Sequence, residues 1–192
     1  MANRPSREEQ ITCHGPGGRK KEFHRANGLL GICFSPRSMD FMGSLNDIQK
    51  RAQEQFDRQS GHYGKSHILA DTADIVEALK GVEICPGMTA LDVATGGGHT
   101  AVFLAERGLH VTAADLSAKM LEATAQLALD RGVSVTTRQH AAEELPYADA
   151  SFDIVTCRTA AHHFSSPAQF ARETARALKP GGAFDSHRRI GP

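Results

Sequence analysis

The chain carries a regular pattern of apolar and polar residues from about residue 45 onward. A helical period opens the pattern, with apolar residues at Leu45, Ile48, Ala52 and Phe56. Ser44, with Asp47 three residues later, is placed to cap this first helix. Short apolar runs then predict buried strands over residues 89–94, 110–114, 133–137 and 152–157.

Helices are expected between and around these strands. The helical spacing predicts them over residues 68–79 and 99–107, and after Ser117 and Ser166, both of which are favourable capping residues. Pro167 follows Ser166 at a position that a first helical turn tolerates. The alternation of strand and helix predicts an α/β fold in which a parallel sheet carries helices on both faces.

The two ends of the chain lack this pattern. Residues 1–43 contain clustered glycines and, through Met42, seven basic against four acidic residues, so we expect a disordered N-terminal arm. A nucleic-acid-binding arm is the alternative interpretation of its basic run. The folded domain is predicted over residues 44–182, with an irregular tail over residues 183–192.

Composition excludes several classes of protein. The 22 basic and 22 acidic residues balance, which gives no electrostatic reason to expect nucleic acid as a partner. The four cysteines form no Cys-x-x-Cys pair and the ten histidines show no zinc-ligand spacing, so no metal site is predicted. No apolar run approaches the roughly 20 residues of a membrane span. We therefore expect a cytoplasmic protein.

A glycine-rich turn follows the strand predicted at residues 89–94. Gly96, Gly97 and Gly98 stand between that strand and a helix, where glycine lets the backbone turn sharply and approach a ligand. The spacing Gly96-x-Gly98-x-x-Ala101 also matches the dinucleotide pattern. The glycines alone therefore leave two classes of ligand open.

Two acidic residues favour one of these classes. Asp92 lies just before the turn, where it would repel a pyrophosphate but pair with an ammonium group. Asp115 ends the next strand, where a carboxylate can accept both hydroxyl groups of a ribose. A ligand with an amino-acid end and a ribose satisfies both positions. The alternative is that Asp92 and Asp115 only cap local backbone.

These residues and three later blocks resemble the class I S-adenosylmethionine-dependent methyltransferases. The similarity is greatest to the type 11 branch, which includes enzymes of ubiquinone and menaquinone biosynthesis. The blocks follow the family order, at Asp92-x-Ala94-x-Gly96-x-Gly98, Asp115, Ala142–Asp153, His162-His163-Phe164 and Leu178–Gly182. The resemblance implies a Rossmann-like, doubly wound sheet with strand order 3-2-1-4, and methyl transfer from S-adenosyl-L-methionine to a small-molecule acceptor.

The resemblance also implies roles for individual residues. The methionine end of the cofactor would be held by the first block, at Asp92, Ala94, Gly96, Gly97 and Gly98. Asp115 would hold the ribose, and Leu116 and the Ala142 backbone would contact the adenine. Ala141 stands where the family often has an aspartate, so one side-chain hydrogen bond to adenine is absent. Tyr63, with Ser66 and His67, resembles a lid segment that closes over the cofactor.

Two histidines are the candidate catalytic residues. His162 and His163 follow the fourth predicted strand, at the sheet edge where ligands bind, and histidine has a suitable pKa for a general base. The alternative is that one packs structurally and the other is solvated. We expect Arg158 to form a surface ion pair, Cys157 to be buried and inert, and His99 to pack beside the cofactor.

The tail departs from the family. Relatives continue after Pro180-Gly181-Gly182 into a fifth strand, whereas residues 183–192 lack an apolar run. We therefore expect a truncated chain whose fourth strand is an exposed edge, through which chains can associate, and which is poorly stable and weakly active. A cofactor-binding fragment with impaired catalysis is one alternative function. An NAD(P)-dependent oxidoreductase is another, against which Asp92 and the later blocks argue.

Overall fold

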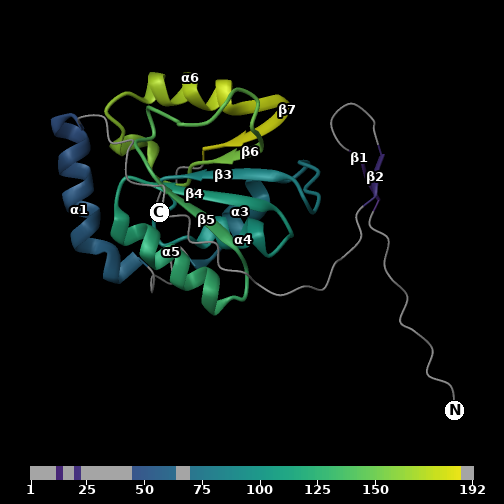
Figure 1. Ribbon diagram of the computed structural model, residues 1–192, viewed down its shortest axis with the longest axis horizontal. Coiled ribbons are helices and arrows are strands. Elements are labelled where there is room, and N and C mark those ends of the chain that lie inside the picture. The colour runs from purple at the N-terminus through teal and green to yellow at the C-terminus, as the bar shows by residue number, and fades with distance from the viewer. Residues whose placement is uncertain (1–11, 15–19, 23–44, 64–69, 187–192) are drawn as a thin grey trace, which may run out of the picture.

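The computed structural model describes residues 12–14, 20–22, 45–63 and 70–186. Its centre is a five-stranded sheet of order β5-β4-β3-β6-β7, in which every neighbouring pair is parallel (Figure 1). The strands are β3 (Thr89–Val93), β4 (His110–Asp115), β5 (Val135–Gln139), β6 (Phe152–Thr156) and β7 (Leu178–Asp185). A separate antiparallel hairpin pairs β1 (Thr12–His14) with β2 (Lys20–Glu22). The other residues of the expected N-terminal arm lie outside the described residues.

Helices cover both faces of the sheet, as the alternating pattern predicts. Figure 1 shows α6 on one face, α4 and α5 on the other, and α1 beside α5 at one end of the sheet. The helices are α1 (Asp47–Tyr63), α3 (Ala73–Ala78), α4 (His99–Ala105), α5 (Ala118–Asp130) and α6 (Pro167–Ala177), with a short 3-10 helix, η1, at Ala161–His163. None of the described helices is long and apolar enough to cross a membrane.

Two hydrophobic clusters, one on each face, hold the helices to the sheet. On one face Ile75 of α3 and Leu104 of α4 pack with alternate strand residues such as Val111. On the other, Phe170 of α6 packs with Val93 and the strand residues that point the opposite way. Because successive side chains of a strand point to opposite faces, a strand buried on both sides reads as a continuous apolar run. The apolar runs at residues 89–94 and 152–157 therefore predict β3 and β6 correctly.

The helix caps are partly as predicted. Ser117 accepts from the Met120 amide and Ser166 from the Gln169 amide, which confirms both as N-caps. The first helix begins later than expected, because Asn46 is its cap. The Asn46 side chain accepts from the Gln49 amide, while the Gln49 side chain accepts from the Asn46 amide, both at 3.0 Å. Ser44 lies outside the described residues.

The expectation that the fourth strand is an exposed edge was wrong. β7 pairs with that strand, β6, in a register that aligns Ile154 with Ala183 and Thr156 with Asp185. Residues 183–185 therefore belong to a strand rather than to an irregular tail, and the parallel order continues to a fifth strand. The sequence pattern missed β7 because residues 179–182 form a bulge that separates Leu178 from the three residues paired after it.

A lysine in this bulge ties three strands together. The Lys179 ammonium donates to the Asp153 carboxylate at 2.8 Å and to the Thr89 hydroxyl at 3.2 Å. The same Asp153 oxygen accepts from the Thr89 amide at 2.8 Å. Burial opposes ionisation of Asp153, but the contacts with Lys179 and Thr89 outweigh it and hold the pKa of Asp153 below its ordinary value. The bulge is therefore held to β6 by an ion pair with Asp153 and to β3 by a hydrogen bond with Thr89.

We expect Lys179→Met to lower the free energy of unfolding by about 1–3 kcal/mol, because it leaves the half-buried Asp153 carboxylate without its counter-charge. Lys80→Met is the matched control, since Lys80 pairs with Glu77 on the surface and such pairs contribute about 0–1 kcal/mol. Urea unfolding at neutral pH measures both. Equal losses for the two variants would contradict the anchoring role of Lys179.

Candidate active site

A cavity opens at the carboxyl ends of β3, β4, β5 and β6, beneath α1. It encloses about 1050 Å³, including the part open to solvent. Its wall includes Asp92, Gly96 and Gly97 from the first predicted block, and Asp115 and Leu116 from the second. The parallel sheet thus brings segments that are separate in the sequence to one edge, where such sheets bind ligands.

The glycine loop between β3 and α4 is held in a left-handed conformation. Ala94, Gly96 and Gly98 have φ values of 54°, 56° and 83°, a region that side chains rarely adopt. A Cβ at Gly98 would lie 2.7 Å from the Thr124 side chain of α5, so Gly98 packs behind the loop. The Thr124 hydroxyl donates to the Gly96 carbonyl at 2.9 Å. Helix α5 therefore fixes the path of the loop, while Ala94, Gly96 and Gly97 line the cavity.

Asp92 is a buried carboxylate in the cavity wall, with only 1% of its surface exposed. It accepts from the hydroxyl groups of Thr95 at 2.6 Å and Thr156 at 2.7 Å. Burial raises the pKa of Asp92 to about 6, although both hydroxyl groups oppose the shift. Asp92 is thus placed to bind a cation, which would restore the charged state that burial disfavours.

Asp115 ends β4 on the other side of the loop. Its carboxylate accepts from the amides of Gly96 and Ser117, both at 2.9 Å, and burial raises its pKa. These local bonds are those that the backbone-capping alternative expects. The structure also places both carboxylates on the wall of one cavity, so the local role and the ligand-binding role are compatible.

The wall beyond Asp115 is formed by Leu116 and the segment after β5. The Leu116 carbonyl accepts from the amide groups of Gln53 at 3.1 Å and Gln139 at 3.0 Å. Leu116, Ala141 and Ala142 all line the cavity. The two glutamines come from α1 and β5, so both elements fix the same turn.

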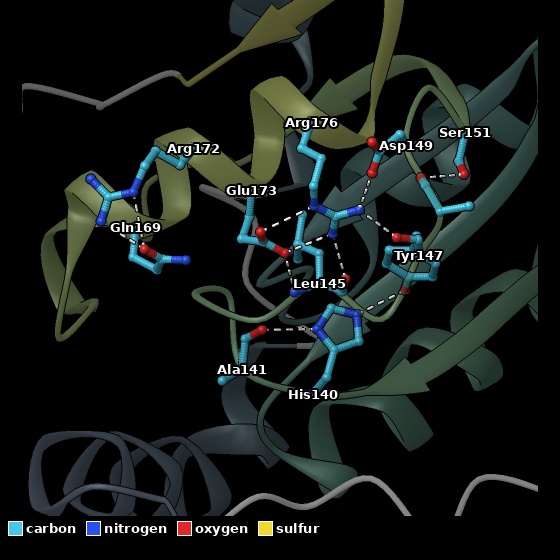
Figure 2. A network of polar contacts seen from close by, with 11 residues as sticks. His140, Ala141, Leu145, Tyr147, Asp149, Ser151, Gln169, Arg172, Glu173 and Arg176 are labelled. Carbon is cyan, nitrogen blue, oxygen red and sulfur yellow. Dashed lines mark hydrogen bonds and ion pairs between the residues drawn. The ribbon is translucent and has the colours of Figure 1, made fainter.

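His140 is a wall residue that the sequence pattern did not indicate. It is buried, with its Nδ1 2.9 Å from the Ala141 carbonyl and its Nε2 2.8 Å from the Tyr147 hydroxyl (Figure 2). A carbonyl only accepts, so Nδ1 carries the proton and Nε2 accepts from Tyr147. Burial lowers the pKa of His140, which keeps the ring neutral. The sequence held no signal for this pair, because the two residues are seven apart in an irregular segment.

The segment after His140 is held from outside by α6. Figure 2 shows the Arg176 guanidinium between α6 and this segment, where it donates to the carbonyls of Leu145 at 2.8 Å and Tyr147 at 2.6 Å. Glu173 binds the same guanidinium at 2.7 Å and accepts from the Leu145 amide at 3.1 Å. The position of the Ala141–Ala142 wall therefore depends on a charged pair on the neighbouring helix.

Helix α1 covers the cavity through a row of polar side chains spaced three to four residues apart. Gln49 donates to Glu143 at 3.0 Å, Asn46 donates to Ser165 at 3.0 Å, and Asp57 accepts from Ser117. Gln53 adds its bond to the Leu116 carbonyl. Of the apolar residues expected on the inner face, Ala52 and Phe56 line the cavity, but Ile48 is 55% exposed.

Tyr63 is the one predicted lid residue that falls within the described part of the chain. Tyr63 is the last residue of α1, but its side chain is outside the described part of the chain, as are Ser66 and His67. Their role as a lid stays a prediction.

The two candidate catalytic histidines differ in their position relative to the cavity. His163 lines the cavity and its ring meets Phe56 edge-to-face at 5.1 Å. His162 is exposed and is not one of the described residues that line the cavity. Its ring is tilted by 42° against that of His163, with 3.9 Å between the ring centroids. Burial, and then the neighbouring His162, lower the pKa of His163. Of the two, His163 is therefore the one placed to act on a bound molecule.

The other three residues singled out in the sequence have different outcomes. Arg158 was expected in a surface ion pair, but it is buried and its guanidinium meets both oxygens of Asp74 at 2.8 and 2.9 Å. The expectation failed because Asp74 of α3 lies next to the segment that follows β6 and binds the Arg158 guanidinium there. Cys157 is buried as predicted, and burial raises the pKa of its thiol to about 12. His99 lines the cavity.

Comparison with known proteins identifies the class. Residues 91–184 match the family described as a methyltransferase domain. The chain is 36% identical over 130 residues to the uncharacterized methyltransferase YcgJ of Bacillus subtilis, covering 67% of this chain and 51% of that protein. It is 41% identical over 97 residues to the ubiquinone biosynthesis O-methyltransferase of Hahella chejuensis, covering 50% of this chain and 41% of that protein.

A solved structure agrees with these matches. The crystal structure of YcgJ superposes with a TM-score of 0.55 at 36% identity, covering 62% of this chain and 49% of that one. The chain spans about half the length of the curated relatives it matches. Residues 91–184 therefore form a domain of the class I methyltransferase family. This membership favours a methyltransferase over the oxidoreductase alternative.

The glycine loop gives a direct test of its packing. We expect Gly98→Ala to be distinctly more destabilising than Gly132→Ala. Both residues have positive φ, which costs a side chain about 1–2 kcal/mol, but a Cβ at Gly98 also collides with Thr124 whereas one at Gly132 meets nothing within 4 Å. Chemical denaturation of the two variants measures the difference, and equal losses would refute the packing of the loop on α5.

Asp92 predicts an unusual dependence of stability on pH. Its pKa is raised from 3.8 to about 6 in the folded state, so the folded protein binds this proton more tightly than the unfolded protein does. The contribution of Asp92 to stability is therefore greatest below pH 3.8 and is lost as the pH rises through about 6. We expect the unfolding free energy of the wild type, relative to that of Asp92→Asn, to decrease as the pH rises from 3.8 through about 6. Urea unfolding of both proteins over this range measures the difference, and a difference independent of pH would contradict the prediction.

Proposed function

We propose that this chain binds S-adenosylmethionine and transfers its methyl group to a small-molecule acceptor. The proposal is carried by two buried carboxylates, Asp92 and Asp115, that flank a left-handed glycine loop in one cavity. An acidic wall of this kind complements a ligand with an ammonium and a sulfonium group. The family membership supports the same ligand.

We assign roles to the binding residues on the basis of their positions in the cavity wall. Asp92 and the loop of Ala94, Gly96 and Gly97 bind the amino-acid end of the ligand, with Gly98 supporting the loop from behind. Asp115 accepts hydrogen bonds from the ribose. Leu116 and the Ala142 backbone form the nucleobase side, which His140 stiffens through its contact with the Ala141 carbonyl. Tyr63 remains a proposed lid residue.

The bound sulfonium supplies an electrophilic methyl group, and the chain supplies alignment and exclusion of water. Helix α1 closes the cavity above the ligand through its polar contacts. His163, which lines the cavity, is the residue we propose as proton acceptor, in preference to the exposed His162. Curated relatives named as O-methyltransferases support an acceptor that is a small molecule.

Calorimetry with S-adenosylhomocysteine tests the binding site. We expect Asp115→Asn to weaken binding at least about tenfold, or roughly 1.4 kcal/mol, because the substitution replaces one of the two accepting oxygens by an NH2 group, which only donates, and removes the negative charge. Asp130→Asn is the control, since Asp130 is exposed on α5. Labelled methyl transfer, measured in parallel, separates an enzyme from a module that binds without turnover. Unchanged affinity in the double variant of Asp92 and Asp115 would refute the proposal.

A further inference from the structure

The nucleobase side of the cavity contains two backbone carbonyls whose acceptor capacity is already used. The Leu116 carbonyl accepts from two glutamine side chains, at 3.1 and 3.0 Å. The Ala141 carbonyl accepts from the His140 ring at 2.9 Å (Figure 2) and from the Glu144 amide at 3.3 Å. A carbonyl oxygen has two lone pairs, so both oxygens are fully occupied by the protein itself.

The side chains on this side of the cavity add no acceptor. Leu116, Ala141 and Ala142 line the cavity with hydrocarbon side chains. Adenine carries an exocyclic amino group, which donates hydrogen bonds, and a donor that loses water without finding an acceptor costs free energy on binding. Neither these side chains nor the two occupied carbonyls can accept from that amino group.

Gln53 of α1 supplies an acceptor at the same place. It is half-buried and lines the cavity. Its Nε2 donates to the Leu116 carbonyl at 3.1 Å, and because a carbonyl only accepts, this contact fixes which end of the amide is the nitrogen. The other end is Oε1, which accepts no hydrogen bond from the described residues.

The neighbouring amide side chains of α1 differ from Gln53 in this respect. Gln49 donates to Glu143, and its Oε1 accepts from the Asn46 amide. The Asn46 side chain donates to Ser165 and accepts from the Gln49 amide. Both side chains use their two ends within the protein. Of the three amide side chains in this row, Gln53 is therefore the one that keeps an oxygen for a ligand.

We propose that Gln53 accepts a hydrogen bond from the exocyclic amino group of the cofactor's adenine, and so makes the cavity prefer adenine to bases that lack this group. The inference rests on the proposed function and adds a specificity-determining residue to its binding site. The nitrogen of the Gln53 amide binds the body of the protein through Leu116, and its oxygen binds the ligand. Helix α1 thus contributes to recognition of the base as well as to covering the cavity.

Calorimetry with a pair of ligands tests this role. The ligands are S-adenosylhomocysteine and its 6-deamino analogue, in which purine replaces adenine and the rest of the molecule is unchanged. We expect the wild type to bind S-adenosylhomocysteine at least about fivefold more tightly than the analogue, the scale of one hydrogen bond. In Gln53→Met, which keeps the length of the side chain but removes its amide, we expect the ratio of the two Kd values to fall below about twofold.

Gln55→Met is the matched control. Gln55 is exposed on the same helix and is not one of the described residues that line the cavity. We expect this variant to keep the ratio of the wild type.

The ratio separates recognition of the amino group from mere support of α1. Loss of the contact between Gln53 and the Leu116 carbonyl does not depend on the base, so a structural role would weaken both ligands by the same factor, and that result would overturn the inference. A preference for adenine that survives Gln53→Met would place the amino group on another acceptor, such as the Ala142 carbonyl or Glu143, and would also overturn it. So would equal binding of the two ligands by the wild type. Failure of the wild type to bind S-adenosylhomocysteine would instead overturn the proposed function, so the two failures are distinguishable.

Discussion

The hydrogen bond between the Gly96 amide and the Asp115 carboxylate joins the glycine loop to the neighbouring strand, and the rest of the site depends on it. The loop is left-handed at three positions, a conformation that persists only where its surroundings hold it. Asp115 holds it from β4, and Thr124 holds it from α5 through the Gly96 carbonyl. The same carboxylate that we assign to a ligand therefore also shapes the loop, and binding and local folding share one residue.

The cavity wall formed by the segment after β5 is held by α6, which lies on the opposite face of the sheet from α4 and α5. Arg176 and Glu173 of α6 bind the segment that contains Leu145 and Tyr147, and Tyr147 orients His140. These contacts are hydrogen bonds to the Leu145 carbonyl, to the Leu145 amide and to the His140 ring nitrogen. They leave the cavity wall after β5 little freedom to move. The two halves of the site are thus held by helices on opposite faces of one sheet, which makes the width of the cavity a property of the sheet itself.

Hydrophobic period and helix capping were enough to predict much of the fold from the sequence. They located β3, β4 and β6, whose residues alternate into two cores, and the caps Ser117 and Ser166. They did not reveal β7, because a bulge at residues 179–182 interrupts the pattern. His140 was missed because its pairing with Tyr147 arises only when an irregular segment folds back. Arg158 was misplaced for a similar reason, since its partner Asp74 is distant in sequence and is brought near by packing.

The row of polar contacts beneath α1 has a consequence for the local stability of this helix. Amide and hydroxyl groups that join this helix to the body of the protein find equivalent partners in water, so separation of each contact costs little net free energy. The sheet beneath it is held by apolar burial, which water does not replace. Separation of this helix from the sheet would therefore cost less free energy than global unfolding, which also exposes the apolar core.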